Sequence, residues 1–472
     1  MTPFAPLTPL ATLAADLDSG ACTSRALLET CLERIDADRA AGAAGAAAFI
    51  AVDADGARAS ADAHDALRRT GVALSPLAGL PVSIKDLFDV RGQVTRAGSV
   101  ALDDAAPATR DAAAVARLRQ AGAVLVGRTN MSEFAFSGLG VNPHYGTPLS
   151  PWRPGEARLA GGSSSGAGVS VARGMAAAAL GTDTGGSIRI PAAFCGLTGF
   201  KPTARRVPGD GAFPLSPTLD SFGPLAPRVA CCALLDALLA GSAGSAADLV
   251  PSARPSAGLR LAVLRNYVQD GLDPDVAAGF AAALSRLSAE GATLIDIDVP
   301  AFDGIATMSR FALPGIEAFA AHRQRLASRG ATYDPRVLSR ILKGESASAA
   351  DYLDLLAARA ALIDAARVAF AGFDAILMPT VAVVPPRLAS VEHDDAEFTR
   401  INALVLRNPT LVNLLDGCAL TIPCGAARPG ASRAAPDGDD DVAPVGLCVF
   451  GLANHDRHLL ALGQGIERTI RG

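Results

Sequence analysis

The stretch Gly161–Ala192 constrains this 472-residue chain more than any other; it reads GGSSSGAGVSVARGMAAAALGTDTGGSIRIPA. Two of its glycine pairs are each followed by serine, and Ser187 comes 24 positions after Ser163. Glycine lets a backbone approach a reacting atom closely, because it has no Cβ. Successive free N–H groups in such a turn can also hold an anion. The small residues Val169–Leu180 predict a helix that returns the chain, so that the two Gly-Ser turns meet.

The sequence on either side alternates helical and extended patterns. Apolar residues at helical spacing predict N-terminal helices, with Thr23 as the N-cap of one of them. Extended runs at Leu80–Ile84 and Ala123–Val126 flank a helical pattern at Asp111–Ala121. Further strands are expected after residue 258, with helices between them, one of which begins after the N-cap Asp273. This alternation indicates an α/β layer architecture.

Composition excludes several classes of protein. The net charge of −5, without a long basic run, argues against a nucleic-acid partner. Apolar runs stop well short of the ~18 residues that span a bilayer, and no signal peptide is visible, so we expect a cytoplasmic chain. Cysteine and histidine spacings match no metal site, and no cofactor is implied. The acidic insert Ala426–Ala443 is expected to form an exposed hairpin tip or flexible loop.

Lysine usage singles out one residue. Only Lys85, Lys201 and Lys343 are lysines, and the other 39 basic residues are arginine. A buried lysine can lose its proton near neutral pH, whereas arginine cannot. Lys85 ends an apolar run, so two interpretations stay open: a buried neutral base, or an ion pair with Asp86 or Asp89. Lys201 precedes a proline and Lys343 lies in a polar segment, which favours structural roles for both.

A lysine base would allow one of the two serines to carry protons and the other to act as a nucleophile. Neutral Lys85 would take a proton from Ser163, which would take one from Ser187, and Ser187 would attack a carbonyl to form an acyl-enzyme. The N–H groups of Thr184, Gly185, Gly186 and Ser187 are placed in sequence to hold the oxyanion.

Other motifs match the same stretch in part. Gly162–Gly166 is a literal G-x-S-x-G, which would make Ser164 an esterase nucleophile with His393, His455 or His458 as its base. That motif needs a strand before it, and none is expected here. Asp183-Thr184-Gly185 matches the D-T-G motif of aspartic proteases. Those enzymes need two facing carboxylates, and the chain has no second D-T-G. The glycines could also merely allow a helix to pack on a strand.

Six segments, in order along the chain, resemble the amidase signature family. They are GLPVSIKD (79–86), GRTNMSEFAFSG (127–138), GGSSSGAGVSVA (161–172), GTDTGGSIRIPAAFCGLTGFKPT (181–203), DAILMPT (374–380) and PVGLCVFG (444–451). The resemblance implies that Lys85 is the base, Ser163 a bridging serine on a cis Gly162–Ser163 peptide, and Ser187 the nucleophile. It also implies an acyl pocket at Phe134, Ala135 and Phe136. Asp183 and Arg189 are interpreted as structural residues that hold the Ser187 turn.

The resemblance further implies a single domain over 1–472, an α/β/α sandwich around one large, twisted, mixed and mostly parallel sheet. Residues 1–72 would be N-terminal helices, 73–228 the catalytic core, and 229–472 the part that completes the sheet.

The family contains stand-alone amidases and the glutaminase subunit of a tRNA-dependent amidotransferase. The amidotransferase branch usually has an acidic residue where this chain has Ser132, and a longer pocket loop rich in methionine and glycine. These departures favour a stand-alone hydrolase, acting as a monomer or homodimer. Phe134, Phe136 and Phe213 suggest small aliphatic or aryl amides and anilides as substrates. Carbamates, including urethanes, and esters extend this set, because the same attack on a carbonyl applies to them.

Overall fold

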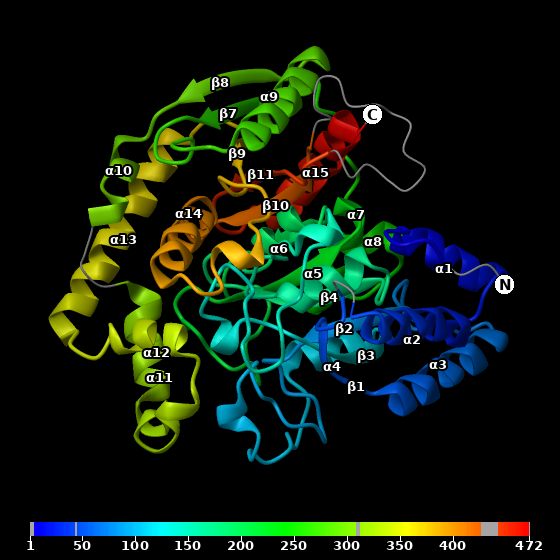
Figure 1. Cartoon of the computed structure of the whole chain (residues 1–472). Helices are drawn as coiled ribbons and strands as arrows, with labels where there is room; N and C mark the ends of the chain where they lie inside the picture. The colour runs from blue at the N-terminus through cyan, green and yellow to red at the C-terminus, as the bar shows by residue number, and fades with distance from the viewer. Residues whose placement is uncertain (1–3, 43–44, 308–311, 426–441, 472) are drawn as a thin grey trace.

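A computed structural model describes residues 4–42, 45–307, 312–425 and 442–471 of the chain. Most of the acidic insert expected at Ala426–Ala443 therefore lies outside the described residues. One sheet holds the eleven described strands. Figure 1 shows it running through the middle of the molecule, between the helices. In spatial order the strands are β1 (Phe49–Val52), β3 (Val124–Thr129), β2 (Pro81–Lys85), β4 (Ala178–Asp183), β6 (Ser221–Ala226), β5 (Thr198–Lys201), β10 (Cys418–Pro423), β11 (Gly446–Gly451), β9 (Ala375–Pro379), β7 (Arg260–Leu264) and β8 (Thr293–Ile297).

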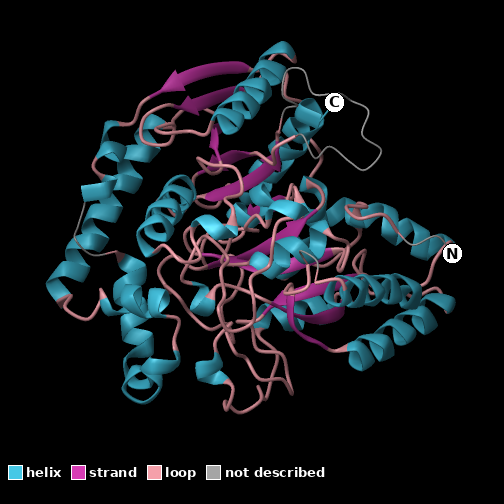
Figure 2. Cartoon of the chain, viewed as in Figure 1, coloured by secondary structure: helices cyan, strands magenta, loops and turns pink. Residues whose placement is uncertain are grey.

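Helices cover both faces of this sheet, which confirms the predicted α/β/α sandwich (Figures 1 and 2). The described helices are α1 (Leu10–Ser19), α2 (Ser24–Ala40), α3 (Ala54–Arg69), α4 (Ala113–Gln120), α5 (Ser165–Ala172), α6 (Arg189–Phe194), α7 (Val229–Leu239), α8 (Ala246–Leu249), α9 (Pro274–Ala289), α10 (Pro300–Asp303), α11 (Leu313–Arg329), α12 (Pro335–Leu342), α13 (Ala349–Ala369), α14 (Asp395–Leu414) and α15 (Asp456–Arg471). Buried residues along each strand alternate between the two faces. One face packs against α4, α7, α9 and α15, and the other against α2, α3, α5, α6, α13 and α14.

The sheet is mixed, as predicted, but the expectation that it is mostly parallel is wrong. Among the described strands, four neighbouring pairs are parallel and six are antiparallel. The parallel pairs join strands at the two flanks, where crossover helices such as α4 and α9 connect them. The centre is antiparallel because β5 and β6, and likewise β10 and β11, follow each other without a crossover helix.

The helix predicted at Val169–Leu180 is also wrong in its bounds. The helix α5 begins earlier, at Ser165, and ends at Ala172. Gly174 then adopts a φ of 64°, a left-handed conformation that commonly ends a helix. The alanines that follow belong to β4, which is buried along its whole length. The returning element between the two serines is therefore a helix followed by a strand.

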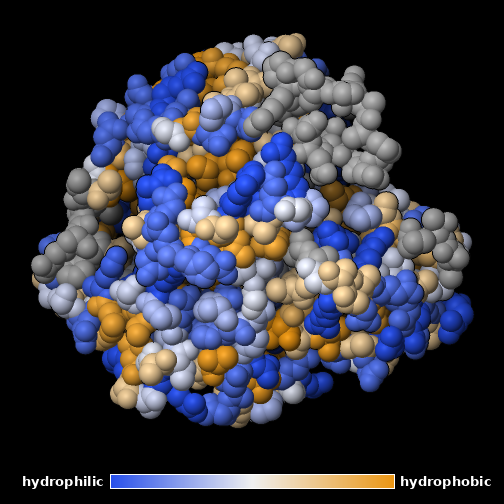
Figure 3. All heavy atoms as spheres, viewed as in Figure 1, coloured by the Kyte–Doolittle hydropathy of each residue, from blue (hydrophilic) through white to orange (hydrophobic). Residues whose placement is uncertain are grey.

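None of the helices in the described part of the chain is both long and apolar enough to cross a bilayer. On the face shown in Figure 3, hydrophobic residues form patches that hydrophilic residues separate.

Candidate active site

Lys85 is the last residue of β2, and its side chain is fully buried. The strands β2 and β4 are parallel neighbours, so their carboxyl ends lie at the same edge of the sheet. Lys85 Nζ consequently lies 2.7 Å from Oγ1 of Thr182 on β4, and also 2.7 Å from Oγ of Ser163. Burial lowers the pKa of Lys85 to about 7, although the charges of Asp220 and Asp183 act to raise it. The amine can therefore be neutral near physiological pH.

The alternative interpretation of Lys85, an ion pair with a nearby aspartate, is wrong. The carboxylate of Asp86 instead pairs with Arg128 on β3, at 3.2 Å, and accepts the N–H of Gly98. Asp89 accepts a hydrogen bond from the hydroxyl of Thr95 at 2.7 Å. Both carboxylates thus have other partners, and Lys85 contacts hydroxyl groups.

Ser163 lies in a tight turn, and the Gly162–Ser163 peptide bond is cis, as the family resemblance implied. The carbonyl of Ser163 accepts the N–H of Ser132 at 3.1 Å, and the N–H of Gly162 donates to Gly138 at 2.8 Å. A Cβ on Gly162 would lie 2.6 Å from the backbone nitrogen of Gly140, so only glycine fits there. The loop after β3 thus fixes the position of the Ser163 turn.

The two Gly-Ser turns meet, as the sequence predicted. The N–H of Ser164 donates to the carbonyl of Ser187 at 3.3 Å, which joins the backbones of the two turns. Ser163 is fully buried and Ser187 is 3% exposed. The side chains of Lys85, Ser163 and Ser187 therefore come from three segments that converge at one edge of the sheet.

Three of the four N–H groups predicted to hold an oxyanion are available. Those of Thr184, Gly185 and Ser187 have no acceptor among the described residues. The fourth differs from the prediction, because the N–H of Gly186 already donates to Oδ1 of Asp183 at 2.9 Å. Gly186 adopts a φ of 121°, which favours glycine in this turn.

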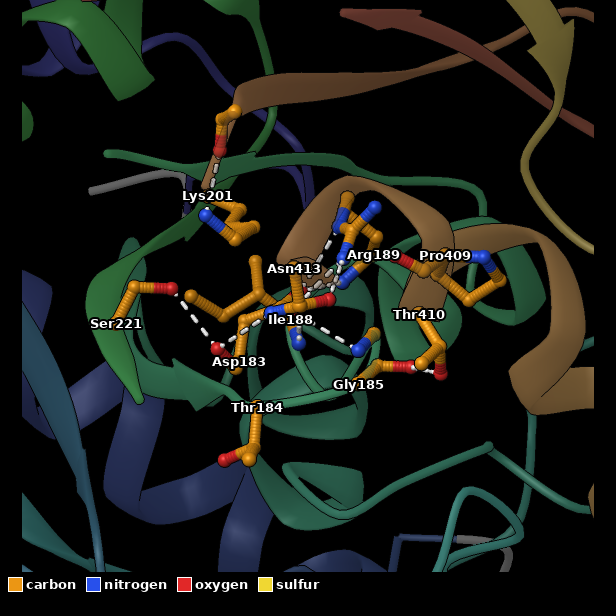
Figure 4. Close-up of polar contacts among 12 residues, drawn as sticks. Asp183, Thr184, Gly185, Ile188, Arg189, Lys201, Ser221, Pro409, Thr410 and Asn413 are labelled. Atoms are coloured by element: carbon orange, nitrogen blue, oxygen red, sulfur yellow. Dashed lines mark hydrogen bonds and ion pairs between the residues drawn. The ribbon is translucent and has the colours of Figure 1, made fainter. Parts of the chain in front are cut away.

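The interpretation of Asp183 and Arg189 as residues that hold this turn is confirmed by their contacts. Both side chains are fully buried, and they pair at 2.9 Å. Asp183 also accepts the backbone N–H groups of Gly186 and Ile188. Figure 4 shows Asn413 between the two charges, where it bonds Asp183 at 3.0 Å and Arg189 at 2.6 Å. Burial opposes ionisation of Asp183, but Arg189 outweighs it and holds the pKa of that carboxyl below its usual value.

Replacing Arg189 with leucine is expected to destabilise the protein by about 3–5 kcal/mol, because Asp183 would remain buried without its counter-ion. The shift of the urea unfolding midpoint measures this loss. Arg205→Leu is the matched control, since Arg205 is 67% exposed where it pairs with Asp416 and should contribute about 1 kcal/mol or less. Equal shifts for the two variants would contradict the structural role of Arg189.

Sequence reasoning missed several residues around the Ser187 turn. Asp220 accepts a hydrogen bond from the Thr184 hydroxyl and also the N–H groups of Leu215 and Ser216. Burial raises the pKa of Asp220 to about 6. Asp220 lies in the segment PLSPTLD, which carries no pattern that points to the turn, and Asn413 lies 226 positions after Ser187. Nothing in the local sequence could have placed either residue there.

The predicted acyl-pocket residues lie in the loop after β3. Phe134 and Ala135 are buried, with φ angles of 50° and 62°. The Phe134 ring lies 5.3 Å from that of Phe213, so two of the three phenylalanines singled out in the sequence come together. Phe136 is half-buried, and its carbonyl accepts a hydrogen bond from Arg340. The Phe134 ring also packs against the rings of His322 and Tyr333, which the sequence did not single out.

The alternative built on Ser164 is wrong. No strand precedes it in the segment 153–163, which the structure describes in full. The Ser164 hydroxyl bonds the backbone of Thr182, and no described histidine contacts it. His393 is 89% exposed. The D-T-G motif likewise has Arg189 and Asn413, not a second carboxylate, beside Asp183. Within the described residues, no cluster of three or more His, Cys, Asp or Glu could hold a metal ion.

The chain is similar in sequence and in fold to known proteins. The chain is 39% identical over 426 residues to the 2-amino-5-chloromuconic acid deaminase of Comamonas testosteroni, covering 88% of this chain and 87% of that protein. It is 35% identical over 458 residues to a subunit of the glutamyl-tRNA(Gln) amidotransferase of Roseiflexus castenholzii, covering 89% and 88%. A crystal structure of an amidase superimposes with a TM-score of 0.85 at 34% identity, covering 98% and 100%. The model of the amidase family matches residues 26–460. The chain therefore belongs to the amidase signature family and is a hydrolase that acts on carbon–nitrogen bonds.

Proposed function

We propose that the protein is a stand-alone amidase in which Ser187 forms an acyl-enzyme, with Ser163 and Lys85 moving the protons. The observation that carries this proposal is the contact of 2.7 Å between Lys85 Nζ and Ser163 Oγ, made by a fully buried lysine. A neutral amine has a lone pair that can accept the Ser163 proton. A protonated lysine at the same place could only donate.

In the proposed reaction, Ser187 Oγ attacks the substrate carbonyl carbon as its proton passes to Ser163 and the Ser163 proton passes to Lys85. The negative oxygen that forms is stabilised by the N–H groups of Thr184, Gly185 and Ser187. The carbon–nitrogen bond then breaks, and the amine leaves with the proton that returns through Ser163. Water next attacks the Ser187 ester by the same proton route, which releases the acid and restores the enzyme.

The pH dependence of the reaction should report on Lys85. Below a pKa of about 7 the amine is protonated and cannot accept a proton, so kcat/KM should fall about tenfold for each pH unit. Asp220→Asn removes a negative charge that raises the pKa of Lys85, so the acid limb should move to lower pH. A profile that rises towards acid pH, or an Asp220→Asn limb displaced to higher pH, would contradict a lysine base.

The stand-alone role is favoured by the loop that contacts the Ser163 turn. Ser132 replaces the acidic residue usual in the amidotransferase branch, and its N–H bonds the Ser163 carbonyl. The pairing of Phe134 with Phe213 favours substrates with an aliphatic or aryl acyl part. We include amides, anilides and, by the same attack, carbamates and esters. The deaminase relative acts on 2-amino-5-chloromuconic acid by its name. The amino group of that acid is not bound to a carbonyl carbon, so the proposed acyl-enzyme reaction does not extend to it.

The glutaminase subunit of an amidotransferase is the second candidate, because the Roseiflexus castenholzii protein matches most of the chain. The two functions are separated by testing the purified chain alone against 4-nitroanilides, phenyl carbamates and glutamine. Hydrolysis of an anilide or carbamate without a partner protein supports the stand-alone amidase. Hydrolysis of glutamine only in the presence of added partner proteins would support the glutaminase and contradict our proposal.

A further inference from the structure

Four rings form a cluster beside the candidate active site, and two of them are carried by segments that contact the proposed catalytic residues. Phe134 follows Ser132, whose N–H bonds the Ser163 carbonyl, and the N–H of Phe213 donates to Leu87, two residues after Lys85. Onto these rings pack His322 of α11 and Tyr333, in the segment that leads to α12. Figure 1 shows α11 and α12 beside the loops that follow β3.

The hydrogen bonds of this cluster determine which nitrogen of His322 carries the proton. Burial lowers the pKa of His322 to about 4, so the ring is neutral at physiological pH and has one N–H. Nδ1 of His322 lies 2.9 Å from the Tyr333 hydroxyl. The Tyr333 hydroxyl carries a proton, and Nδ1 is its only hydrogen-bond partner found among the described residues. If Tyr333 donates to Nδ1, both of these atoms are paired and the imidazole proton is on Nε2. The other tautomer would leave the buried Tyr333 proton without an acceptor among the described residues, so the Nε2–H tautomer is favoured.

The N–H at Nε2 has no acceptor. His322 is fully buried, and Nε2 has no hydrogen-bond partner among the described residues. Its ring meets Phe134 edge to face, with centroids 4.5 Å apart, and such a contact replaces only part of a hydrogen bond. Buried polar groups without partners are rare in folded proteins and call for an explanation. Here the unpaired donor lies among the rings of the proposed acyl pocket.

We propose that the Nε2 proton of His322 binds a hydrogen-bond acceptor on the acyl part of the substrate, and that the protein therefore prefers aryl acyl groups bearing an ether or carbonyl oxygen. The inference rests on the proposed acyl-enzyme function and names its substrate class. The aromatic rings of Phe134 and Phe213 bind the apolar part of such a group. Tyr333 holds the imidazole in the tautomer that donates.

Two pairs of substrates measure the effect of the acceptor oxygen by itself. They are the 4-nitroanilides of 4-methoxy- and 4-ethylbenzoic acid, and those of the 3-methoxy and 3-ethyl acids. Each pair differs only by an oxygen in place of a methylene. The ratio of kcat/KM within a pair should be about tenfold in favour of methoxy in at least one pair, as expected for one hydrogen bond. Intrinsic reactivity cancels when this ratio is compared between variants.

His322→Phe keeps an aromatic ring and removes the donor, so the ratio should fall to about one. Tyr333→Phe leaves the tautomer unspecified and should give an intermediate ratio. The control is His64→Phe in α3, because His64 is half-buried and lies outside the cluster; it should keep the wild-type ratio. An unchanged ratio in His322→Phe, or wild-type ratios near one in both pairs, would overturn the inference.

A result that contradicts the proposed function can be distinguished from one that contradicts the inference about His322. If the wild-type protein hydrolyses none of the four anilides, binding of the corresponding benzamides is measured by calorimetry instead. Tighter binding of a methoxy than of an ethyl benzamide, lost in His322→Phe, would still support the inference. Equal affinities would overturn it.

Discussion

Replacing Ser187 with alanine is expected to lower kcat at least ~10³-fold on any amide that the wild-type protein hydrolyses. The reason is that the proposed mechanism forms the acyl-enzyme on Ser187 and uses the Ser163 hydroxyl only to relay protons. Substrate binding should persist, because the N–H groups and the aromatic rings remain. Steady-state kinetics on an anilide, together with calorimetry of the same compound on the variant, measure both quantities.

Two neighbouring serines provide the controls for this variant. Ser165→Ala is the matched one, because the buried Ser165 hydroxyl has no partner among the described residues and its loss should change kcat little. Ser164→Ala removes a hydroxyl that bonds the Thr182 backbone, and it should retain most of the activity. A loss on Ser164→Ala as large as that on Ser187→Ala would contradict Ser187 as the only nucleophile.

Replacing Lys85 with methionine is the second substitution with a large expected effect, also at least ~10³-fold in kcat at pH 7–8. Methionine keeps an unbranched apolar chain of similar length and removes the amine that accepts the proton. Ser163→Ala should cost somewhat less, because water can take the place of one hydroxyl in a proton path. The kcat of each variant is compared across pH 6–10. Full activity of Lys85→Met at neutral pH would exclude the lysine base.

Lys201 provides a control for the effect of replacing a buried lysine that has no proposed role in catalysis. It is fully buried like Lys85, and burial lowers its pKa to about 8. Its amine nevertheless donates to the carbonyls of Pro202 and Gly417, and it bonds no serine hydroxyl in the part of the chain that the structure describes. Lys201→Met should therefore lower the unfolding midpoint and keep the acid limb of the pH profile. An acid limb that disappears only in Lys85→Met identifies Lys85 as the group that titrates.

Local patterns in the sequence predicted much of the fold. Thr23 and Asp273 cap α2 and α9 as expected, because capping depends on residues within one turn. The burial of Lys85 at a strand end followed from the apolar run before it. The antiparallel centre of the sheet could not be predicted, because strand direction depends on pairing between segments far apart in the chain. The bounds of α5 were missed because alanine, which favours helices, also fills the buried strand β4.

The candidate site likewise has residues that the sequence predicted and residues that it did not. The glycines and serines of the two turns could be read from sequence, because backbone geometry demands those residue types there. The partners of the turns could not. Asn413 reaches Asp183 from α14, and Asp220 reaches Thr184 from the segment before β6. His322 and Tyr333 reach Phe134 from the region of α11 and α12. These contacts depend on how distant elements pack, which no local spacing records.

The central claim, that Ser187 is a self-sufficient nucleophile, is tested most directly by treating the purified chain with a fluorophosphonate and mapping the label by peptide mass spectrometry. We predict a single label on Ser187, abolished in Ser187→Ala and strongly slowed in Lys85→Met. Label on Ser164 would contradict the claim and support the G-x-S-x-G alternative, in which Ser164 is the nucleophile. No label on the chain alone would contradict it as well and would favour a site that partner proteins must complete.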